Sequence, residues 1–269
     1  MGVTLSGTGI SSLLLPLYTY FLIENYGWRL AFVGLGALIL LVIVPILYLF
    51  LFSVRDRQRR GLLVPTAPAR PSTDWRRLVF TRPFLQMALA ALATALVVPP
   101  LVISAAPVLV SGGLSRADAA GIVSLIGITS TAGRLAIGWT LDRIDGRAVA
   151  GFVVFLPTIT CALLIWATGS VMAATVALLV LGLALGAEAD LVAYLTSRYF
   201  PLANFGLLFG LLTGILALAG SGGPLLLSAV YDSTHSYVPA LIAAIPLCPI
   251  AALLFVTLGP YPDQGTDAA

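Results

Sequence analysis

The chain consists of long apolar runs separated by short polar segments. A helix needs about 20 mostly apolar residues to cross a bilayer, because its backbone groups can bond only within the helix there. Eight runs of roughly this length occur, at residues 3–23, 29–53, 84–108, 119–141, 148–168, 171–195, 203–230 and 237–258. The pattern therefore predicts an all-α, polytopic membrane protein with 8 transmembrane helices.

The composition supports this fold class and excludes several others. Of the 269 residues, 59% are hydrophobic and 9% are charged, whereas soluble domains carry about 25% charged residues. A soluble enzyme, a nucleic-acid-binding protein, a disordered tail and a secreted disulfide scaffold are excluded on this ground. Cys161 and Cys248 lie inside apolar runs, where we expect them to be small buried hydrophobes. We expect no metal, no cofactor and no catalytic activity, since the single histidine, His235, cannot build a catalytic site around a nucleophile.

The basic residues, all of them arginine, indicate how the helices are oriented. Of the 14 arginines, 11 fall at loops on one side of the predicted membrane, which are Arg55, Arg57, Arg59, Arg60, Arg70, Arg76, Arg77, Arg82, Arg143, Arg147 and Arg198. Loops rich in arginine remain in the cytoplasm. We therefore expect both termini on the cytoplasmic side of the cell membrane, with Arg134 inside a helix.

Residues 54–83 form a polar linker between two groups of helices. It opens with the charge run RDRQRR, passes through three prolines that favour an extended chain, and closes on STDWRRLVF, which predicts a short helix on the membrane surface. Recognition of anionic lipids and a simple topology-setting loop both remain open as its role. The linker follows a partial N-terminal bundle of two helices (1–53) and precedes a six-helix bundle (84–258) and a cytoplasmic tail (259–269).

The first two helices resemble the last two, which indicates an internal repeat. Each pair has a glycine-rich entry, a proline, an apolar run and a short turn that carries an aromatic residue. Transporters are often built from such repeats, with the substrate between them. With a repeat of six helices, we expect four helices to be missing at the N-terminus.

Three stretches resemble the Major Facilitator Superfamily. GWR at 27–29 with AF at 31–32 is similar to its turn between helices 5 and 6, and GRLAIGWTLDRIDGR at 133–147 to its helix 8 and the following loop. That loop matches the pattern G-x-x-x-D-R-x-G-R with one extra residue before Gly146. GAEADLVAYLTSRYFP at 186–201, followed by FGLLFG, resembles helices 10 and 11 of the monocarboxylate-porter and oxalate/formate-antiporter branches.

The resemblance implies functions for two groups of residues. An arginine at the helix-8 position binds the anionic substrate in these branches, and Arg134 matches it by its spacing to Gly138. The loop motif latches helix ends together in the outward-facing state, and its residues here are Gly138, Asp142, Arg143, Gly146 and Arg147. Ser130 stands where some relatives have an aspartate, and residues 203–232 lack the second basic residue expected for a dicarboxylate site.

Helical spacing supports a binding role for Arg134. Ser124, Gly127, Thr131, Arg134 and Gly138 follow one another at intervals of three and four, so they share one face. A guanidinium inside a membrane must face a partner or a water-filled cavity, and its planar fork fits a carboxylate. We predict that Arg134, Thr131 and Ser130 bind substrate, with a structural salt bridge as the alternative role of Arg134.

The acids of the run 171–195 are the expected partners in that salt bridge. Glu188 and Asp190 lie at about the depth of Arg134, and either could instead carry a proton. Gly182, Gly186, Asp190, Tyr194 and Arg198 step by four along one face, where the glycines permit close packing. We group Glu188, Asp190 and Arg198 as charge partners.

Glycine and proline mark two further helices. Gly206, Gly210 and Gly214, continued by Ala217 and Ser221, form a small-residue ladder that predicts helix packing. We expect Pro99, Pro100 and Pro107 to interrupt the third predicted helix. We expect Gly220, Gly222, Gly223 and Pro224 to interrupt the seventh.

These observations predict secondary active transport of a small, monocarboxylate-like anion by alternating access. There are two alternatives. The protein could be a drug or metabolite efflux porter, or it could be a truncated fragment that does not transport on its own. The expected partners are the lipid bilayer and a small solute, with or without a coupling proton, and no nucleic acid. Activity would need the missing helices or a partner chain.

Overall fold

The computed structural model describes residues 18, 21–22, 25–45, 75–166 and 169–262. All regular structure within these residues is helical, which confirms the all-α fold class. Seven of the described helical segments are long and apolar enough to span a membrane, which are Asn25–Ile43, Arg82–Ile103, Arg116–Leu141, Gly146–Trp166, Val171–Tyr199, Leu202–Thr234 and Val238–Val256. The predicted helix at 3–23 lies almost wholly outside the described residues.

The chain divides into two compact units, Met1–Arg70 and Pro71–Ala269. In the first unit, the membrane-length segment Asn25–Ile43 includes a π-helical turn, η1 (Ile39–Ile43). The Tyr18 hydroxyl donates to the carbonyl of Gly34 at 3.4 Å, and the Leu22 side chain lies against the same glycine. Gly34 therefore lets the chain segments of this unit approach closely.

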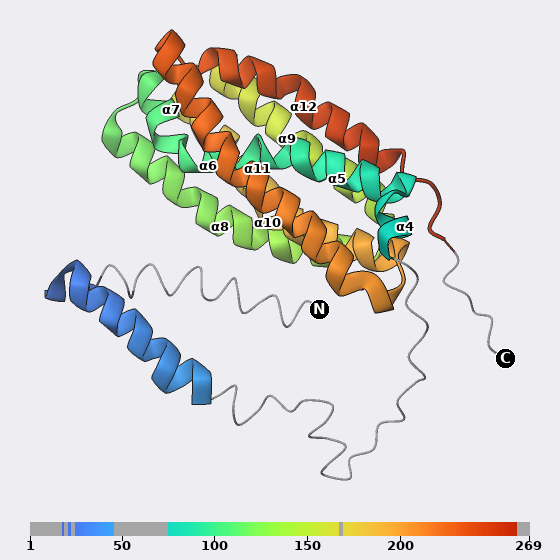
Figure 1. The fold of residues 1–269 in the computed structure, drawn as a ribbon. Coiled ribbons are helices and arrows are strands. Elements are labelled where there is room, and N and C mark those ends of the chain that lie inside the picture. Colours follow the sequence, from blue (N-terminus) through green and yellow to red (C-terminus); the bar gives the residue numbers. More distant parts are fainter. Residues whose placement is uncertain (1–17, 19–20, 23–24, 46–74, 167–168, 263–269) are drawn as a thin grey trace. The chain divides into compact units, whose positions relative to one another are not determined.

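The second unit begins with the short helix α4 (Trp75–Val79), where the sequence predicts a short helix. Its first membrane-length segment, Arg82–Ile103, is divided into α5 (Arg82–Ala95) and α6 (Val98–Ile103), and α7 (Ala105–Ser111) follows it. The others are α8 (Arg116–Leu141), α9 (Gly146–Trp166), α10 (Val171–Tyr199), α11 (Phe205–Thr234, after the turn η2, Leu202–Asn204) and α12 (Val238–Val256). Helix α10 packs on α8 and α9, α9 on α12, and α5 on α11 and α12 (Figure 1).

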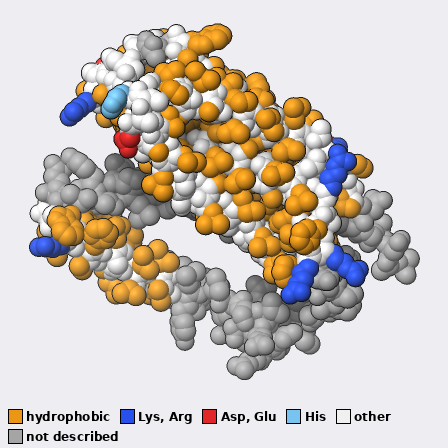
Figure 2. Space-filling model, turned by 45° about the horizontal axis from the view of Figure 1, so that its top comes forward, with side chains coloured by type: hydrophobic (Ala, Val, Ile, Leu, Met, Phe, Trp, Pro, Cys, Tyr) orange, Lys and Arg blue, Asp and Glu red, His pale blue; other side chains and the backbone are white. Residues whose placement is uncertain are grey.

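The surface of the second unit has the character of a membrane-embedded bundle. Hydrophobic side chains cover the middle of the face shown in Figure 2, and the charged side chains lie toward the ends. Large apolar residues such as Leu135, Phe152 and Leu218 are exposed on its helices. Lipid is the solvent in which such a surface is stable.

The predicted interruption of the third apolar run by Pro99 and Pro100 is present, as the break between α5 and α6. Thr94 and Val97 bracket a turn between α5 and α6, and Pro99 and Pro100 fall in the first turn of α6. A proline in the first turn costs no hydrogen bond, because its missing N–H would have had no partner there.

The predicted interruption of α11 is wrong. The helix runs unbroken from Phe205 to Thr234 with Pro224 inside it. The glycines before the proline serve a different purpose, because a Cβ on Gly223 would collide with the ring of Pro100, and one on Gly220 would touch Pro99 at 3.4 Å. They allow α11 to pack closely on α6.

The small-residue ladder makes no close contact with the described residues of its own unit, so its predicted packing stays a prediction. Nothing among those residues lies within 4 Å of the Cβ position of Gly206, Gly210 or Gly214. Ala217 and Ser221, which continue the ladder, are exposed as well. The described glycines that do pack tightly between helices include Gly133, Gly151, Gly182, Gly186 and Gly223.

Candidate functional site

Arg134 lies on α8 where that helix crosses α10. Its Nε lies 3.5 Å from Asp190 Oδ2 and donates to the carbonyl of Gly186 at 3.4 Å. The crossing is close because Gly186 has no side chain, so the backbone of Ser130 rests directly on it. Two consecutive turns of α10 thus hold the guanidinium in place.

The ion pair is partly withdrawn from solvent. The side chain of Arg134 is 28% exposed and that of Asp190 is 11% exposed. Arg134 lies seven residues before Leu141, the last residue of α8, which is about 10 Å along the helix axis. A charge at this depth needs its partner, since an isolated ion in such surroundings costs several kcal/mol.

The face of α8 that carries Arg134 is open in the described structure. We use "open face" for Ser124, Gly127, Thr131, Arg134 and Gly138. Gly127 and Gly138 have nothing within 4 Å of their Cβ positions, and Ser124 is exposed. Thr131 and Ser130 each donate to the carbonyl of Gly127 at 3.0 Å, so their oxygens keep lone pairs while their protons are used within the helix.

The two acids of α10 lie in different places. Asp190 lies against Arg134, whereas Glu188 has a buried Oε1 without a hydrogen-bond partner and forms no ion pair within the described residues. The expectation that Glu188 pairs with Arg134 is therefore wrong. Residues two apart on a helix differ by about 200° in direction, so the two carboxylates cannot both face α8.

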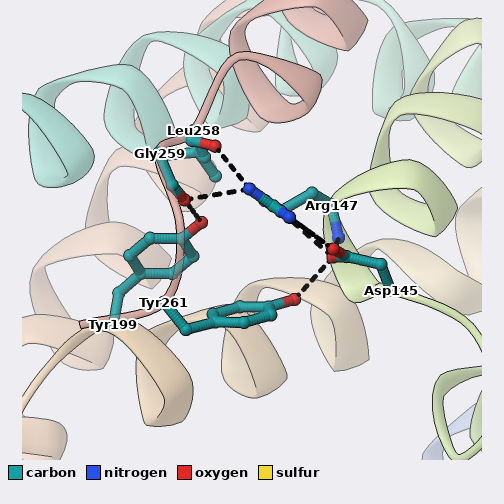
Figure 3. Close-up of polar contacts among 6 residues, drawn as sticks. All are labelled: Asp145, Arg147, Tyr199, Leu258, Gly259 and Tyr261. Atoms are coloured by element: carbon teal, nitrogen blue, oxygen red, sulfur yellow. Dashed lines mark hydrogen bonds and ion pairs between the residues drawn. The ribbon is translucent and has the colours of Figure 1, made fainter. Parts of the chain in front are cut away.

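The loop after α8 and the segment after α12 meet in a second polar group (Figure 3). We call Asp145, Arg147, Tyr199, Leu258, Gly259 and Tyr261 the loop–tail cluster. Arg147 forms a bidentate ion pair with Asp145, with Nη2 to Oδ2 at 2.5 Å and Nε to both oxygens at 3.1 Å. Its Nη1 donates to the carbonyls of Leu258 and Gly259 at 3.1 and 3.2 Å.

Two tyrosines complete the loop–tail cluster. The Tyr199 hydroxyl at the end of α10 donates to the Gly259 carbonyl at 2.5 Å, and the Tyr261 hydroxyl donates to Asp145 Oδ1 at 2.8 Å. Hydrogen bonds from Arg147 hold the pKa of Asp145 below its ordinary value. Burial, together with the hydrogen bond to Asp145, raises the pKa of Tyr261 to about 12. Residues 258–261 are therefore fixed to the bundle at the end where α8 and α10 finish.

The loop motif is present, but its acid is not the one expected. Asp142 is exposed at the end of α8 and forms no ion pair within the described residues, whereas Asp145 pairs with Arg147. The extra residue before Gly146 is the signal that could have identified Asp145. The loop is one residue longer than the family pattern, which places an acid two positions before Arg147.

The remaining motif residues have defined neighbours. Gly146 lies under the ring of Tyr194, where any side chain would collide. The Arg143 guanidinium lies 4.0 Å over the Trp139 ring, and that of Arg198 lies 5.0 Å over the Tyr261 ring. Arg198 thus lies beside the loop–tail cluster rather than beside Arg134. Its positive charge at the C-terminal end of α10 also interacts favourably with the helix dipole.

The described residues contain no group of three or more His, Cys, Asp or Glu side chains that could hold a metal ion. Cys161 and Cys248 are both buried free cysteines, and they do not form a disulfide with each other.

Comparison with known proteins identifies the family. The model of the Major Facilitator Superfamily matches residues 1–224. Monocarboxylate transporter 12 of Rattus norvegicus is 26% identical over 167 residues, and that of Mus musculus is 28% identical over 166 residues. Each match covers 53% of this chain and 34% of the relative, so the chain spans about a third of the length of these relatives. The chain belongs to the Major Facilitator Superfamily of membrane transporters and is similar to its monocarboxylate porters.

Proposed function

We propose that the protein carries a small organic anion of the monocarboxylate class across the cell membrane by alternating access. Arg134 is the counter-charge for the substrate carboxylate. The observation that supports this is the position of its guanidinium, which is partly desolvated on the open face of α8 and held from one side by Asp190. The similarity to monocarboxylate transporter 12 supports the substrate class.

The ion pair suggests how the site binds and releases its ligand. Asp190 neutralises Arg134 when no substrate is bound, so the empty site does not leave a bare charge in the membrane. A substrate carboxylate approaching along the open face would bind the planar guanidinium with two parallel hydrogen bonds. The Ser130 and Thr131 hydroxyls lie beside it and would donate to the same anion after rotating away from Gly127.

Alternating access requires two bundles that rock against each other. The proposed activity is therefore that of the assembled transporter, in which α5–α12 form one bundle. The loop motif would then control closure on the cytoplasmic side, where both termini are expected.

Counterflow in proteoliposomes tests the anion site. Vesicles loaded with unlabelled lactate, pyruvate or formate receive the same labelled anion outside, and its entry is followed with time. We expect Arg134→Ala to reduce the initial rate at least about tenfold, the loss expected for one desolvated charge-assisted contact. Arg134→Lys keeps the positive charge but loses the planar guanidinium. Its initial counterflow rate should lie between those of the unmodified protein and Arg134→Ala.

Arg116→Ala is the matched control, because it removes the same charge from an exposed position at the start of the same helix. Its counterflow should equal that of the unmodified protein. Unchanged counterflow in Arg134→Ala, with all three proteins folded by circular dichroism, would show that the anion does not bind there.

A further inference from the structure

Helix α4 and the start of α5 carry exposed arginines that neither the anion site nor the loop–tail cluster uses. Arg77 on α4 and Arg82 on α5 are exposed, and neither forms an ion pair with another described residue. The chain has no acidic residue from Trp75 to Ala117, and α11, on which both helices pack, has none before Asp232. The described residues therefore leave a net positive charge at the end of the bundle where α4 lies and α5 begins (Figure 1).

The backbone that carries these arginines is held by the bundle. Leu78 and Val79 of α4 pack against its hydrophobic core. The N–H and the hydroxyl of Thr81 both donate to the carbonyl of Leu78, at 3.1 and 2.6 Å, which fixes the turn between α4 and α5. The Leu85 N–H then donates to the Thr81 carbonyl at 3.1 Å in the first turn of α5. The two arginines therefore have a defined place at the surface of the bundle.

Exposed aromatic side chains accompany the arginines. Trp75 begins α4 and Phe80 follows its last residue, and both are exposed. The Arg76 guanidinium lies 5.5 Å over the Trp75 ring. Tryptophan is enriched at the level of the lipid headgroups, where its ring contacts acyl chains and its N–H contacts polar groups. Helix α4 thus has the composition of a segment that lies at the boundary between headgroups and hydrocarbon.

The face of α5 that begins at Arg82 is apolar over the depth of one leaflet. Leu85, Leu89 and Leu92 are exposed and follow Arg82 at intervals of three, four and three, so the four residues share one face. The distance from Arg82 to Leu92 is about 15 Å along the helix axis, which is half of a hydrocarbon core of about 30 Å. A cation at the headgroup level with an apolar face of this length beside it matches the two parts of a phospholipid.

We infer that Arg77 and Arg82 bind the headgroup of an anionic phospholipid whose acyl chains lie along Leu85, Leu89 and Leu92. The positive charge of this surface selects the headgroup, because the choline of phosphatidylcholine neutralises its own phosphate whereas phosphatidylglycerol keeps a net negative charge. A guanidinium also fits a phosphate with two parallel hydrogen bonds. This end of the bundle carries the arginine-rich loops that we expect in the cytoplasm, and the cytoplasmic leaflet contains anionic lipids.

Quenching of Trp75 fluorescence by phospholipids with brominated acyl chains tests this inference. The whole chain is used with Trp28→Phe, Trp139→Phe and Trp166→Phe, which leaves Trp75 as its single tryptophan. It is placed in phosphatidylcholine vesicles that contain the same fraction of either brominated phosphatidylglycerol or brominated phosphatidylcholine. We expect phosphatidylglycerol to quench as if it were enriched at least about threefold around Trp75, since one arginine near an anionic surface favours binding about fivefold. The enrichment should decrease in about 0.5 M sodium chloride, because salt screens exposed charges.

Charge variants identify the residues that cause the enrichment. Arg77→Gln with Arg82→Gln should abolish it, whereas Arg77→Lys with Arg82→Lys should keep most of it, because the positive charges remain. Arg116→Gln neutralises an exposed arginine at the start of α8 and is the matched control, which should leave the enrichment unchanged. All variants should keep the fold, which circular dichroism verifies, since the three arginines are exposed.

Two results would overturn the inference. Equal quenching by the two lipids around Trp75 in the folded protein would mean that other groups neutralise the arginines. Enrichment that persists in Arg77→Gln with Arg82→Gln would mean that the anionic lipid binds elsewhere. Neither result depends on transport, so this test and the counterflow assay succeed or fail independently.

Discussion

Gly186→Ala should destabilise the folded protein by about 2–4 kcal/mol, although it adds one methyl group. A Cβ at this position would overlap the carbonyl oxygen of Ser130 and lie 2.7 Å from its carbonyl carbon and 2.9 Å from its Cα. These are backbone atoms of α8, so they cannot rotate aside as a side chain would. Relief requires α8 and α10 to separate, which also weakens the contacts that Arg134 makes with Gly186 and Asp190.

Gly210→Ala is the matched control, because it makes the same chemical change inside another membrane helix. Nothing among the described residues lies within 4 Å of its Cβ position. Alanine favours a helix over glycine by up to about 1 kcal/mol, so this variant should be as stable as the parent or slightly more stable. Unfolding in detergent, followed by circular dichroism against temperature or added SDS, measures both. Equal stability of the two alanine variants would mean that α8 and α10 are not in close contact.

Arg147→Ala should lower stability by about 1–3 kcal/mol, a range that allows for the partial exposure of the Arg147–Asp145 pair. The substitution removes the bidentate ion pair with Asp145 and both hydrogen bonds to the end of α12. Arg77→Ala, an exposed arginine on α4, is the control and should change little. The same detergent unfolding assay compares them.

The loop–tail cluster should also give stability a defined dependence on pH. Asp145 has a lowered pKa in the folded protein, so its contribution is complete above its ordinary value of 3.8 and is lost as the pH falls below that value. Tyr261 has a raised pKa, so its contribution is complete below the ordinary value of 10.0 and is lost as the pH rises toward about 12. Between these two pH limits, the contribution of the loop–tail cluster to the free energy of unfolding should be constant.

Single substitutions separate the two ends of this profile. The stability difference between the parent and Asp145→Asn should shrink at low pH, and that between the parent and Tyr261→Phe should shrink at high pH. A difference that stays constant across the whole range for both variants would mean that neither group makes its contact in the folded protein.

Apolar run length and helical spacing were sufficient to predict most of the fold, because both follow from constraints that lipid imposes on every residue. The run at 171–195 corresponds to α10, and the spacing of Gly182, Gly186 and Asp190 correctly identified the face that meets α8. Helix continuity was less predictable. Pro99 and Pro100 lie in the first turn of a new helix, α6, whereas Pro224 lies inside the unbroken α11, because tolerance of a proline depends on its surroundings.

Residues of the candidate site could be predicted from the sequence only where they share one face of a single helix. Glu188 and Asp190 are both acids at similar depth, and only the packing of α8 on α10 shows that Asp190 is the one that pairs with Arg134. The loop–tail cluster joins residues far apart in the sequence, so no local pattern reveals it. Tyr199 and Tyr261 resemble ordinary interfacial aromatics until the carbonyl of Gly259 and the carboxylate of Asp145 are seen beside them.

The contact between Arg147 and Leu258 has a consequence for the biogenesis of the protein. The two residues are 111 positions apart, and the carbonyl partners come from the chain just beyond the last helix. Chains are synthesised from the N-terminus, and their parts fold as they emerge. The bonds of Arg147 to Leu258 and Gly259 therefore cannot form until α12 has been synthesised, whereas its ion pair with Asp145 can form earlier because the two residues are neighbours in the chain.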